Sequence, residues 1–445
     1  MEKSSKKIIP KGVRLWNRAK NLIPGGTQLL SKRAEMFLPD GWPSYYKKAK
    51  GVEVWDLSGR KFIDMSYMSL GAATLGYSDP DVNKAVSKVL NNGVVSTLNT
   101  PFDVELAELL CKLHPWAGQV KFARTGGEAM TVAVRIARAY TDRDKIVFCG
   151  YHGWHDWYLA ANLAHKKNLD GHLLPGLFPR GVPRALKGTA FTFHYNKFSE
   201  LERIAARHKK TIAAVVIEPM RHHEPEDDFL KKVRNLVSKI GAVLIFDEIT
   251  IGFRKNIGGV HLLYKVNPDI AVFAKGISNG HPMAAIIGKK RVMDAAETSF
   301  ISSTYWTEAV GPAAVIATIK KMQRLNVPAH LKKIGEKISE GWKIRAANYG
   351  LKINILGPEP LITFSFDYGS KNQILKTIFT QEMLKRGFLA GPSVYVSYAH
   401  KDSHVKKYLK AIDEVFAIVK KSVDSKNPKK FLKGPVARSG FKRLT

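Results

Sequence analysis

Lys275 stands at the end of an apolar run and directly before a glycine, in the stretch "IAVFAKGISNG". A lysine amine that is desolvated among apolar neighbours has a lowered pKa and becomes a nucleophile that can form a Schiff base with a carbonyl group. A lysine at the edge of a core can equally extend its ammonium group into solvent, which is the ordinary structural explanation. Taken alone, the residue leaves both interpretations open.

Asp247 and Glu248 follow another apolar run, in "AVLIFDEITIGFR". A carboxylate at the end of a buried strand is costly unless it pairs with a cation or with a protonated ring nitrogen. A helix N-cap or a structural salt bridge is the simpler explanation for any single aspartate. The position therefore needs support from other residues before it indicates a site.

Two further stretches place ligand-binding residue types after apolar runs. In "KFARTGGEAM", Thr125, Gly126 and Gly127 precede a helix, whose first N–H groups and positive dipole end can bind a phosphate. A plain connecting turn explains the two glycines at least as well. In "KIVFCGYHGWHDWY", the ring of Tyr151 could stack on a flat heterocycle or pack in an interface.

The four features are more informative together than singly. A phosphate cradle, a stacking aromatic ring, a strand-end aspartate and a strand-end lysine are the parts that hold pyridoxal phosphate. They would bind its phosphate, one ring face, its pyridine nitrogen and its aldehyde, in that order. The combination predicts a site for this cofactor.

Secondary-structure patterns explain how these residues could meet. Between about residues 120 and 290, short apolar runs alternate with amphipathic stretches of helix length, such as "EAMTVAVRIARAY". This pattern predicts an α/β fold with a mostly parallel sheet covered by helices on both faces. Ligands bind beyond the carboxyl ends of the strands in such sheets, which is where the four features stand.

We predict four segments along the chain. Residues 1–75 form an N-terminal segment with a short helix and a hairpin, and residues 76–315 form a large α/β domain. Residues 316–425 form a smaller α+β domain together with the N-terminal segment. A basic tail, residues 426–445, follows it.

The charge balance is strongly basic. The chain has 71 Lys and Arg residues against 38 Asp and Glu residues, a formal net charge of +33. Such a surplus attracts polyanions. No helix-turn-helix, zinc-finger or RNP pattern accompanies the basic residues, so we expect anionic small molecules as partners and no specific nucleic-acid recognition.

Other classes of protein find little support. No apolar run approaches the roughly 18–20 residues that cross a bilayer, and the N-terminal apolar stretch is too short for a secretory signal, so we expect a cytoplasmic protein without a membrane segment. Cys111 and Cys149 are too few for a disulfide framework. Two histidine pairs lack a cluster of cysteines or carboxylates beside them, so we expect no metal site; they are His152 with His155, and His222 with His223.

With their neighbours, these residues form stretches that resemble the class III pyridoxal-phosphate aminotransferases of fold type I, and among them the branch similar to glutamate-1-semialdehyde aminomutase. The resemblance covers nearly the whole chain and rests on "LIPGG", "TGGEAMTVAVRIARAYTDRDKI", "YHG", "VVIEP", "DEITIGFR", "NPDIAVFAKGISNGHPMAAIIG" and "MLKRGFLAGPSVYVSYAHKD". It implies pyridoxal phosphate as cofactor, and a homodimer with two shared active sites.

The resemblance also implies a role for each matching residue. Lys275 would form the Schiff base with the cofactor, and Asp247 would pair with the pyridine nitrogen. The remaining positions would surround the cofactor: Tyr151 and Ile249 on the two ring faces, Gly126 and Gly127 with N–H groups on the phosphate, Thr125, His152 and Glu218 close by, and Thr304 on the phosphate of the neighbouring subunit.

Some positions depart from the aminomutase pattern. Lys32, with Arg33 next to it, stands where the aminomutases have an arginine for the substrate carboxylate, and a lysine lacks the bidentate fork. Gly127 replaces a hydroxyl residue of the phosphate cradle. We therefore expect an aminotransferase that moves an amino group from an amino acid to a keto or aldehyde acceptor, an anionic or sugar-nucleotide one suiting the basic surface.

Two alternatives remain open. The same scaffold could support an aminomutase or a racemase. The chain could also be a polyanion-binding protein with a vestigial enzyme fold, in which the basic tail is the working part.

Overall fold

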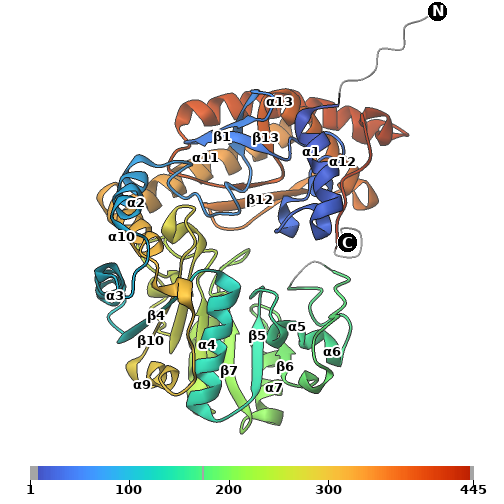
Figure 1. The fold of residues 1–445 in the computed structure, drawn as a ribbon. Coiled ribbons are helices and arrows are strands. Elements are labelled where there is room, and N and C mark those ends of the chain that lie inside the picture. Colours follow the sequence, from blue (N-terminus) through green and yellow to red (C-terminus); the bar gives the residue numbers. More distant parts are fainter. Residues whose placement is uncertain (1–8, 173–174, 441–445) are drawn as a thin grey trace, which may run out of the picture. The chain divides into compact units, whose positions relative to one another are not determined.

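The structure is a computed structural model that describes residues 9–172 and 175–440 (Figure 1). It contains two compact units. The larger unit consists of Gly71–Leu75 and Asp79–Lys332, and the smaller unit of the chain up to Leu70, Gly76–Ser78 and the chain from Lys333 onward. Of the helices in these described ranges, none has the length and the apolar character that a membrane crossing requires.

A seven-stranded sheet forms the centre of the larger unit, in the order β4-β10-β9-β8-β7-β5-β6. The neighbours from β9 to β6 pair in parallel, whereas β10 pairs antiparallel with both β4 and β9. The expected mostly parallel sheet is confirmed. The strands are β4 (Gln119–Ala123), β5 (Lys145–Cys149), β6 (Ala190–Thr192), β7 (Ile212–Ile217), β8 (Val243–Asp247), β9 (Ile270–Phe273) and β10 (Ala284–Gly288).

Helices cover the sheet, which explains why its central strands are apolar throughout. The helix α4 (Gly126–Thr141) runs along one face (Figure 1). Alternate side chains of β5, β7 and β8 form a buried cluster with α7 (Phe198–His208) and α8 (Phe229–Lys239). Every residue of β7 and β8 is buried as a result.

The larger unit ends later than the sequence placed it. The predicted boundary near residue 315 falls inside α10 (Val310–Arg324), which packs against α2 (Pro80–Asn92). A buried ion pair joins the two helices, because Lys321 Nζ lies 2.7 Å from Oδ2 of Asp79, the N-cap of α2. The helix pattern alone did not reveal this packing.

The unit also contains several shorter elements. These are α3 (Pro101–Leu113), α5 (Asp156–Leu159), α6 (Ala161–Ala164), α9 (Lys290–Met293) and the 3₁₀ turns η4 (Arg184–Leu186), η5 (Val260–Leu262), η6 (Lys275–Ser278), η7 (Asp294–Ala296) and η8 (Thr304–Thr307). The long helix α11 (Val327–Asn348) then takes the chain into the smaller unit.

The smaller unit is α+β and draws its strands from both ends of the chain, as expected. One sheet has the order β1-β2-β3-β13 and another the order β11-β12-β14. The predicted hairpin is the antiparallel pair of β2 and β3. The elements are α1 (Lys11–Leu22), η1 (Pro24–Gly26), η2 (Leu30–Lys32), η3 (Ala34–Met36), β1 (Tyr46–Lys50), β2 (Glu53–Asp56), β3 (Lys61–Met65), β11 (Ile353–Leu356), β12 (Leu361–Phe366), η9 (Gly369–Lys371), α12 (Asn372–Lys385), β13 (Phe388–Ala390), β14 (Ser393–Tyr395), α13 (Asp402–Asp424) and η10 (Pro428–Phe431).

The basic tail packs on α12 over most of its length. Ala437 is buried, and its N–H donates to Oγ1 of Thr377 at 3.0 Å. The side chain of Gln381 donates to the carbonyl of Phe431 and accepts from the N–H of Lys433. The tail therefore belongs to the smaller unit up to residue 440, and residues 441–445 of the predicted tail lie outside the described residues.

Candidate active site

Five parallel strands of the large sheet end at the same edge. A polar residue that the sequence analysis had singled out stands at the end of each strand, either as its last residue or within two residues after it. These residues are Thr125 after β4, Tyr151 after β5, Glu218 after β7, Asp247 at the end of β8 and Lys275 after β9. The edge gathers them because parallel strands present their carboxyl ends on one side.

Lys275 is held in an unusual conformation with its amine in the interior. Its φ angle is 51°, in the left-handed region that is costly for a residue with a side chain. Its Nζ donates to Oγ1 of Thr250 at 2.8 Å. Burial lowers its pKa to about 8, with a further lowering by the Arg221 guanidinium that Asp247 partly offsets. The amine is therefore far more nucleophilic at neutral pH than an exposed lysine.

Asp247 forms a buried pair with His152. Its Oδ2 lies 2.8 Å from His152 Nδ1, and its Oδ1 accepts from the N–H of Ile249 at 3.0 Å. The other ring nitrogen, Nε2, lies 3.1 Å from the carbonyl of Cys149, which can only accept. Nε2 therefore carries a hydrogen, and the contact with the carboxylate needs a second proton between Nδ1 and Oδ2.

Glu218 anchors the segment after β5. Its Oε2 accepts from the backbone N–H of Tyr151 and from Nη1 of Arg221, each at 3.1 Å. Burial acts to raise the pKa of this carboxyl, but Arg221, His152 and the hydrogen bonds outweigh it and lower the pKa overall. Glu218 is thus a buried carboxylate that fixes the backbone next to the Tyr151 ring.

The first turn of α4 forms an open cradle. Thr125 caps the helix with a capping box. Its hydroxyl accepts from the Glu128 N–H, and the Glu128 side chain accepts from the N–H of Thr125. A Cβ on Gly126 would lie 2.9 Å from Cδ1 of Ile249. Glycine here leaves room beside the N–H groups at the positive end of the helix dipole, as an anion site requires.

Glu248 has a structural role, unlike its neighbour Asp247. Its Oε1 accepts from His261 Nδ1 at 2.7 Å, and Trp116 Nε1 donates to Nε2 of the same ring. The two bonds fix His261 as the neutral tautomer with its hydrogen on Nδ1. Among the residues that the structure describes, no cluster of three or more histidine, cysteine or acidic side chains could hold a metal ion.

Three predicted residues are not among those gathered at the sheet edge. Thr304 is exposed at the start of η8, a segment tied to the end of β4 because Nε of Arg124 lies 2.8 Å from Oε1 of Glu308. Lys32 is exposed and Arg33 is half-buried, and both belong to the smaller unit. Their predicted contacts with a partner's phosphate and with substrate remain predictions.

Three residues of the site escaped the sequence reasoning. Thr250 contacts the lysine amine, Arg221 contacts Glu218, and the buried Arg254 donates from Nε to the carbonyl of Thr250 at 2.8 Å. Thr250 and Arg221 each stand three residues after a strand-end carboxylate. That position was the available signal, since the turn after a buried strand stays close to the strand end.

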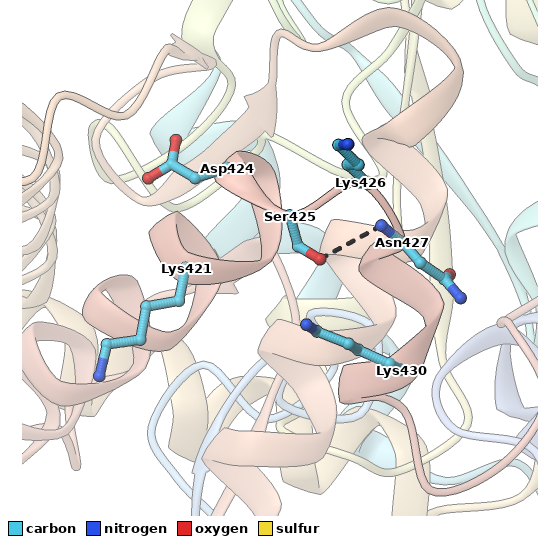
Figure 2. A pocket seen from close by; sticks show the side chains of 6 residues that line it. All are labelled: Lys421, Asp424, Ser425, Lys426, Asn427 and Lys430. Carbon is cyan, nitrogen blue, oxygen red and sulfur yellow. Dashed lines mark hydrogen bonds between the residues drawn. The ribbon is translucent and has the colours of Figure 1, made fainter.

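A surface hollow in the smaller unit offers a contrast. It has a volume of about 570 Å³, lies at the end of α13, and is lined by Lys421, Asp424, Ser425, Lys426, Asn427 and Lys430 (Figure 2). Its three lysines are exposed, and the hydrogen bond drawn there joins the N–H of Asn427 to Oγ of Ser425. It lacks the buried, paired charges that distinguish the edge of the large sheet.

Comparison with known proteins places the chain in a family. The family model for class-III aminotransferases matches residues 39–415. The chain belongs to the class-III aminotransferase family. The resemblance seen in its sequence motifs is thereby confirmed, and the protein is an enzyme that uses pyridoxal phosphate.

Alignments with individual relatives cover almost the entire length of this chain. The 3-aminobutyryl-CoA aminotransferase of Cloacimonas acidaminovorans is 30% identical, over 93% of this chain and 98% of its own. The glutamate-1-semialdehyde 2,1-aminomutase of Alkaliphilus oremlandii is 32% identical, over 91% of this chain and 98% of its own. The structure of the FumI protein of Sphingopyxis sp. MTA144, in its internal aldimine form with pyridoxal phosphate, matches with a TM-score of 0.84 at 24% identity, over 95% of this chain and 99% of that one, which shows the shared fold.

The residues at the sheet edge fit this cofactor. The lowered pKa of Lys275 suits reaction with an aldehyde, and the open first turn of α4 suits a phosphate. The buried Asp247 carboxylate, backed by His152, suits a protonated ring nitrogen. The aldehyde, the phosphate and the ring nitrogen of the cofactor would thus each find a fitting group at one edge of one sheet.

Proposed function

We propose that the enzyme moves an amino group from an amino-acid donor to a keto or aldehyde acceptor, with Lys275 as the residue that attaches pyridoxal phosphate. One observation carries this proposal. The Lys275 amine, with its pKa lowered to about 8 and its Nζ on Thr250, lies in the same strand-end cluster as the buried Asp247–His152 pair. A nucleophilic amine and a proton-holding carboxylate are the two groups that this chemistry requires from the protein.

Each further residue of the cluster has a role in holding the cofactor. Gly126 and Gly127 would donate backbone N–H groups to its phosphate at the start of α4, where Thr125 caps the helix. Tyr151 and Ile249 would contact the two faces of its ring. Glu218 supports this arrangement through its hydrogen bond from the Tyr151 N–H, and His152 through its bond to Asp247.

The chain's own groups account for the proton transfers. When bound, pyridoxal phosphate supplies a ring that takes up the electrons released at the donor carbon. Asp247, with the proton that it shares with His152, would keep a hydrogen on the ring nitrogen. Lys275 has a pKa near neutral pH, so its amine can both accept the proton of the donor carbon and return a proton, while Thr250 orients it.

The charge of the protein favours anionic substrates. The net charge of +33 raises the local concentration of anions. We infer an acceptor that carries phosphate or carboxylate groups, such as a keto or aldehyde sugar nucleotide. A coenzyme A thioester, the kind of substrate named for the Cloacimonas relative, would also meet this requirement.

We also propose that the enzyme is a homodimer with shared active sites. A groove of about 910 Å³ lies along α4 and residues 298–302, and exposed apolar side chains line it. Phe300 is 92% exposed and Trp154 70% exposed, and nearby Tyr305 is 72% exposed. Exposed aromatic side chains of this kind are typical of a covered interface, where Thr304 would reach the partner's phosphate.

The experiment uses the purified enzyme loaded with pyridoxal phosphate. We expect the visible absorbance of a lysine-attached cofactor, its loss in Lys275→Ala, and its retention in the control Lys320→Ala, which changes an exposed lysine of the same unit. Single amino acids should then convert the cofactor to its amino form with release of a keto acid. A wild-type enzyme that stays colourless after addition of the cofactor would contradict the proposal.

The same assay separates the aminomutase. An aminomutase would convert one molecule into its isomer without releasing a keto acid from simple amino acids. The lysine at position 32, which lacks the bidentate fork of an arginine, favours the aminotransferase.

A further inference from the structure

We propose that His155 binds the phosphate of pyridoxal phosphate and takes the place of a hydroxyl side chain at position 127. The inference rests on the proposed function, because it completes the phosphate subsite of the cofactor attached to Lys275. His155 follows β5 and belongs, like Gly127, to the larger unit. The sequence patterns gave this histidine no role, because nothing in them places it near α4.

The imidazole of His155 lies over the second glycine of the cradle. A Cβ on Gly127 would lie 3.3 Å from Cδ2 and 3.4 Å from Nε2 of the ring. These two atoms form one edge of the imidazole, so the edge that carries Nε2 is the one nearest to the first turn of α4. The ring occupies space that a side chain at position 127 would need.

Two further contacts hold the loop of His155 against the same turn. Gly153, with a φ angle of 105°, approaches so closely that a Cβ on it would lie 3.0 Å from the Cα of Gly127. Trp157 Nε1 donates to Oγ1 of Thr131 at 3.2 Å, and this hydroxyl donates to the carbonyl of Gly127 at 3.0 Å. The imidazole is therefore fixed beside the cradle.

The ring nitrogens of His155 are available for a ligand. Within residues 9–172 and 175–440, neither nitrogen takes part in a hydrogen bond or an ion pair, and the side chain does not cap α5, which begins at the next residue. The ring of Trp154 stacks on the imidazole, with centroids 4.5 Å apart, and leaves its edges open. A neutral imidazole offers one N–H donor, and a charged one offers two.

The proposal explains why a glycine and a histidine meet at this point. The class III resemblance places a hydroxyl residue where this chain has Gly127, so the cradle lacks one donor. A serine side chain at position 127 would crowd the imidazole, because its Cβ would lie within 3.4 Å of two ring atoms. The space beside the first turn of α4 thus holds either the hydroxyl or the imidazole, and in this chain it holds the imidazole.

The pKa of His155 gives the contact a measurable signature. Burial lowers this pKa, and the carboxylates of Glu128 and Asp156 offset the effect only in part, so the ring is mostly neutral at pH 7 in the cofactor-free protein. A phosphate dianion beside the ring would stabilise the imidazolium and raise the pKa. His155 would then donate a charge-assisted hydrogen bond to the phosphate.

The test compares pyridoxal phosphate with pyridoxal, which keeps the aldehyde and lacks the phosphate. Absorbance titration of the cofactor-free protein would give a Kd for each. The variants are His155→Phe, which keeps a ring beside Trp154 without nitrogen atoms, and His155→Gln, which restores an N–H donor. The control His165→Phe replaces an exposed histidine of the same unit.

We expect His155→Phe to raise the Kd for pyridoxal phosphate by about 10-fold, as for the loss of one charged hydrogen bond, and to leave the Kd for pyridoxal nearly unchanged. His155→Gln should fall between His155→Phe and the wild type, and His165→Phe should match the wild type. Gly127→Ser should recover affinity in the His155→Ala protein and not in the wild type, where the imidazole occupies the space of the hydroxyl.

Nuclear magnetic resonance of isotope-labelled histidine gives a readout that does not depend on turnover. The resonance of His155 would be assigned by its loss in His155→Gln. Its pKa should lie below 6.5 in the cofactor-free protein and rise when pyridoxal phosphate binds. Pyridoxal should not raise this pKa.

Other outcomes would overturn the inference. Equal losses of affinity for pyridoxal phosphate and pyridoxal in His155→Phe would show that the residue only supports its loop, and an unchanged Kd for pyridoxal phosphate would exclude the contact. If His155→Phe fails to fold, the titration of the wild-type histidine decides, because a pKa that does not respond to the cofactor refutes the proposal. A wild-type protein that takes up no cofactor would contradict the proposed function instead, so the two failures are distinct.

Discussion

His152 Nδ1 lies 2.8 Å from Asp247 Oδ2, and both side chains are buried. The histidine comes from the turn after β5 and the aspartate from the end of β8, so the pair joins two strands that β7 separates. Nε2 of the same ring lies 3.1 Å from the Cys149 carbonyl, and this contact fixes the orientation of the ring. In the proposed function, His152 would therefore hold the Asp247 carboxylate in place for the ring nitrogen of the cofactor.

Removing the histidine should weaken both catalysis and folding. We expect His152→Ala to lower kcat by about 10- to 100-fold, because Asp247 loses a charged hydrogen bond, and to cost about 1–3 kcal/mol of stability. Steady-state kinetics and urea unfolding would measure the two effects. His165→Ala removes an exposed histidine and should change neither; a wild-type kcat in His152→Ala would refute the role of the pair.

The lowered pKa of Lys275 predicts the pH dependence of its reactivity. The unprotonated amine is the nucleophile, so reactivity should rise as pH increases through about 8 and level off above it, well before an ordinary lysine does. Competitive acetylation of the cofactor-free protein with acetic anhydride would give the midpoint. Mass spectrometry would compare Lys275 with added Nα-acetyllysine, whose side-chain amine is free. A midpoint equal to that of the free amine would contradict the buried position.

Thr250 supplies the control for that experiment. Its Oγ1 accepts from the Lys275 amine, and an acceptor stabilises the charged ammonium. Thr250→Val should therefore move the acetylation midpoint to lower pH, whereas Thr250→Ser should leave it unchanged. A shift to higher pH in the valine variant would exclude this hydrogen bond.

The cradle at the start of α4 depends on a missing side chain. A Cβ on Gly126 would lie 2.9 Å from Ile249 Cδ1, so Gly126→Ala should displace Ile249 and weaken cofactor binding by about 10-fold, equivalent to roughly 1.4 kcal/mol. Adding Ile249→Val removes Cδ1 and should restore part of the affinity. Fluorescence titration of the cofactor-free protein would measure it. A Gly126→Ala protein with unaltered affinity would place the phosphate elsewhere.

The exposed aromatic side chains predict the assembly. Phe300→Asp places a charge on a 92% exposed apolar position that the proposed interface would bury, so it should shift a dimer toward monomers. Analytical ultracentrifugation over a concentration series would show this. The control Phe178→Asp changes a 57% exposed phenylalanine outside the groove and should remain dimeric. A monomeric wild-type enzyme would rule out the shared site.

The sequence predicted the ends of the strands better than the contacts that residues make there. Short apolar runs located β5, β7, β8 and β9, and therefore the strand-end residues Asp247 and Lys275, because burial on both faces requires such runs. Strand order does not follow from local patterns, so the partnership of His152 with Asp247 across β7 was not foreseen. Arg221 and Thr250 were missed because their roles depend on where a turn directs its side chains.

The antiparallel strand β10 contributes no residue to the site, yet it lies between β4 and β9. Adjacent strands are about 4.8 Å apart, so this one strand spaces the phosphate cradle after β4 from the Lys275 end of β9 by about 10 Å. Because β10 runs antiparallel to both neighbours, its carboxyl end and the loop that follows it lie at the opposite edge of the sheet, away from the candidate site. The width of β10 therefore sets the length of a molecule that can reach from the first turn of α4 to the Lys275 amine.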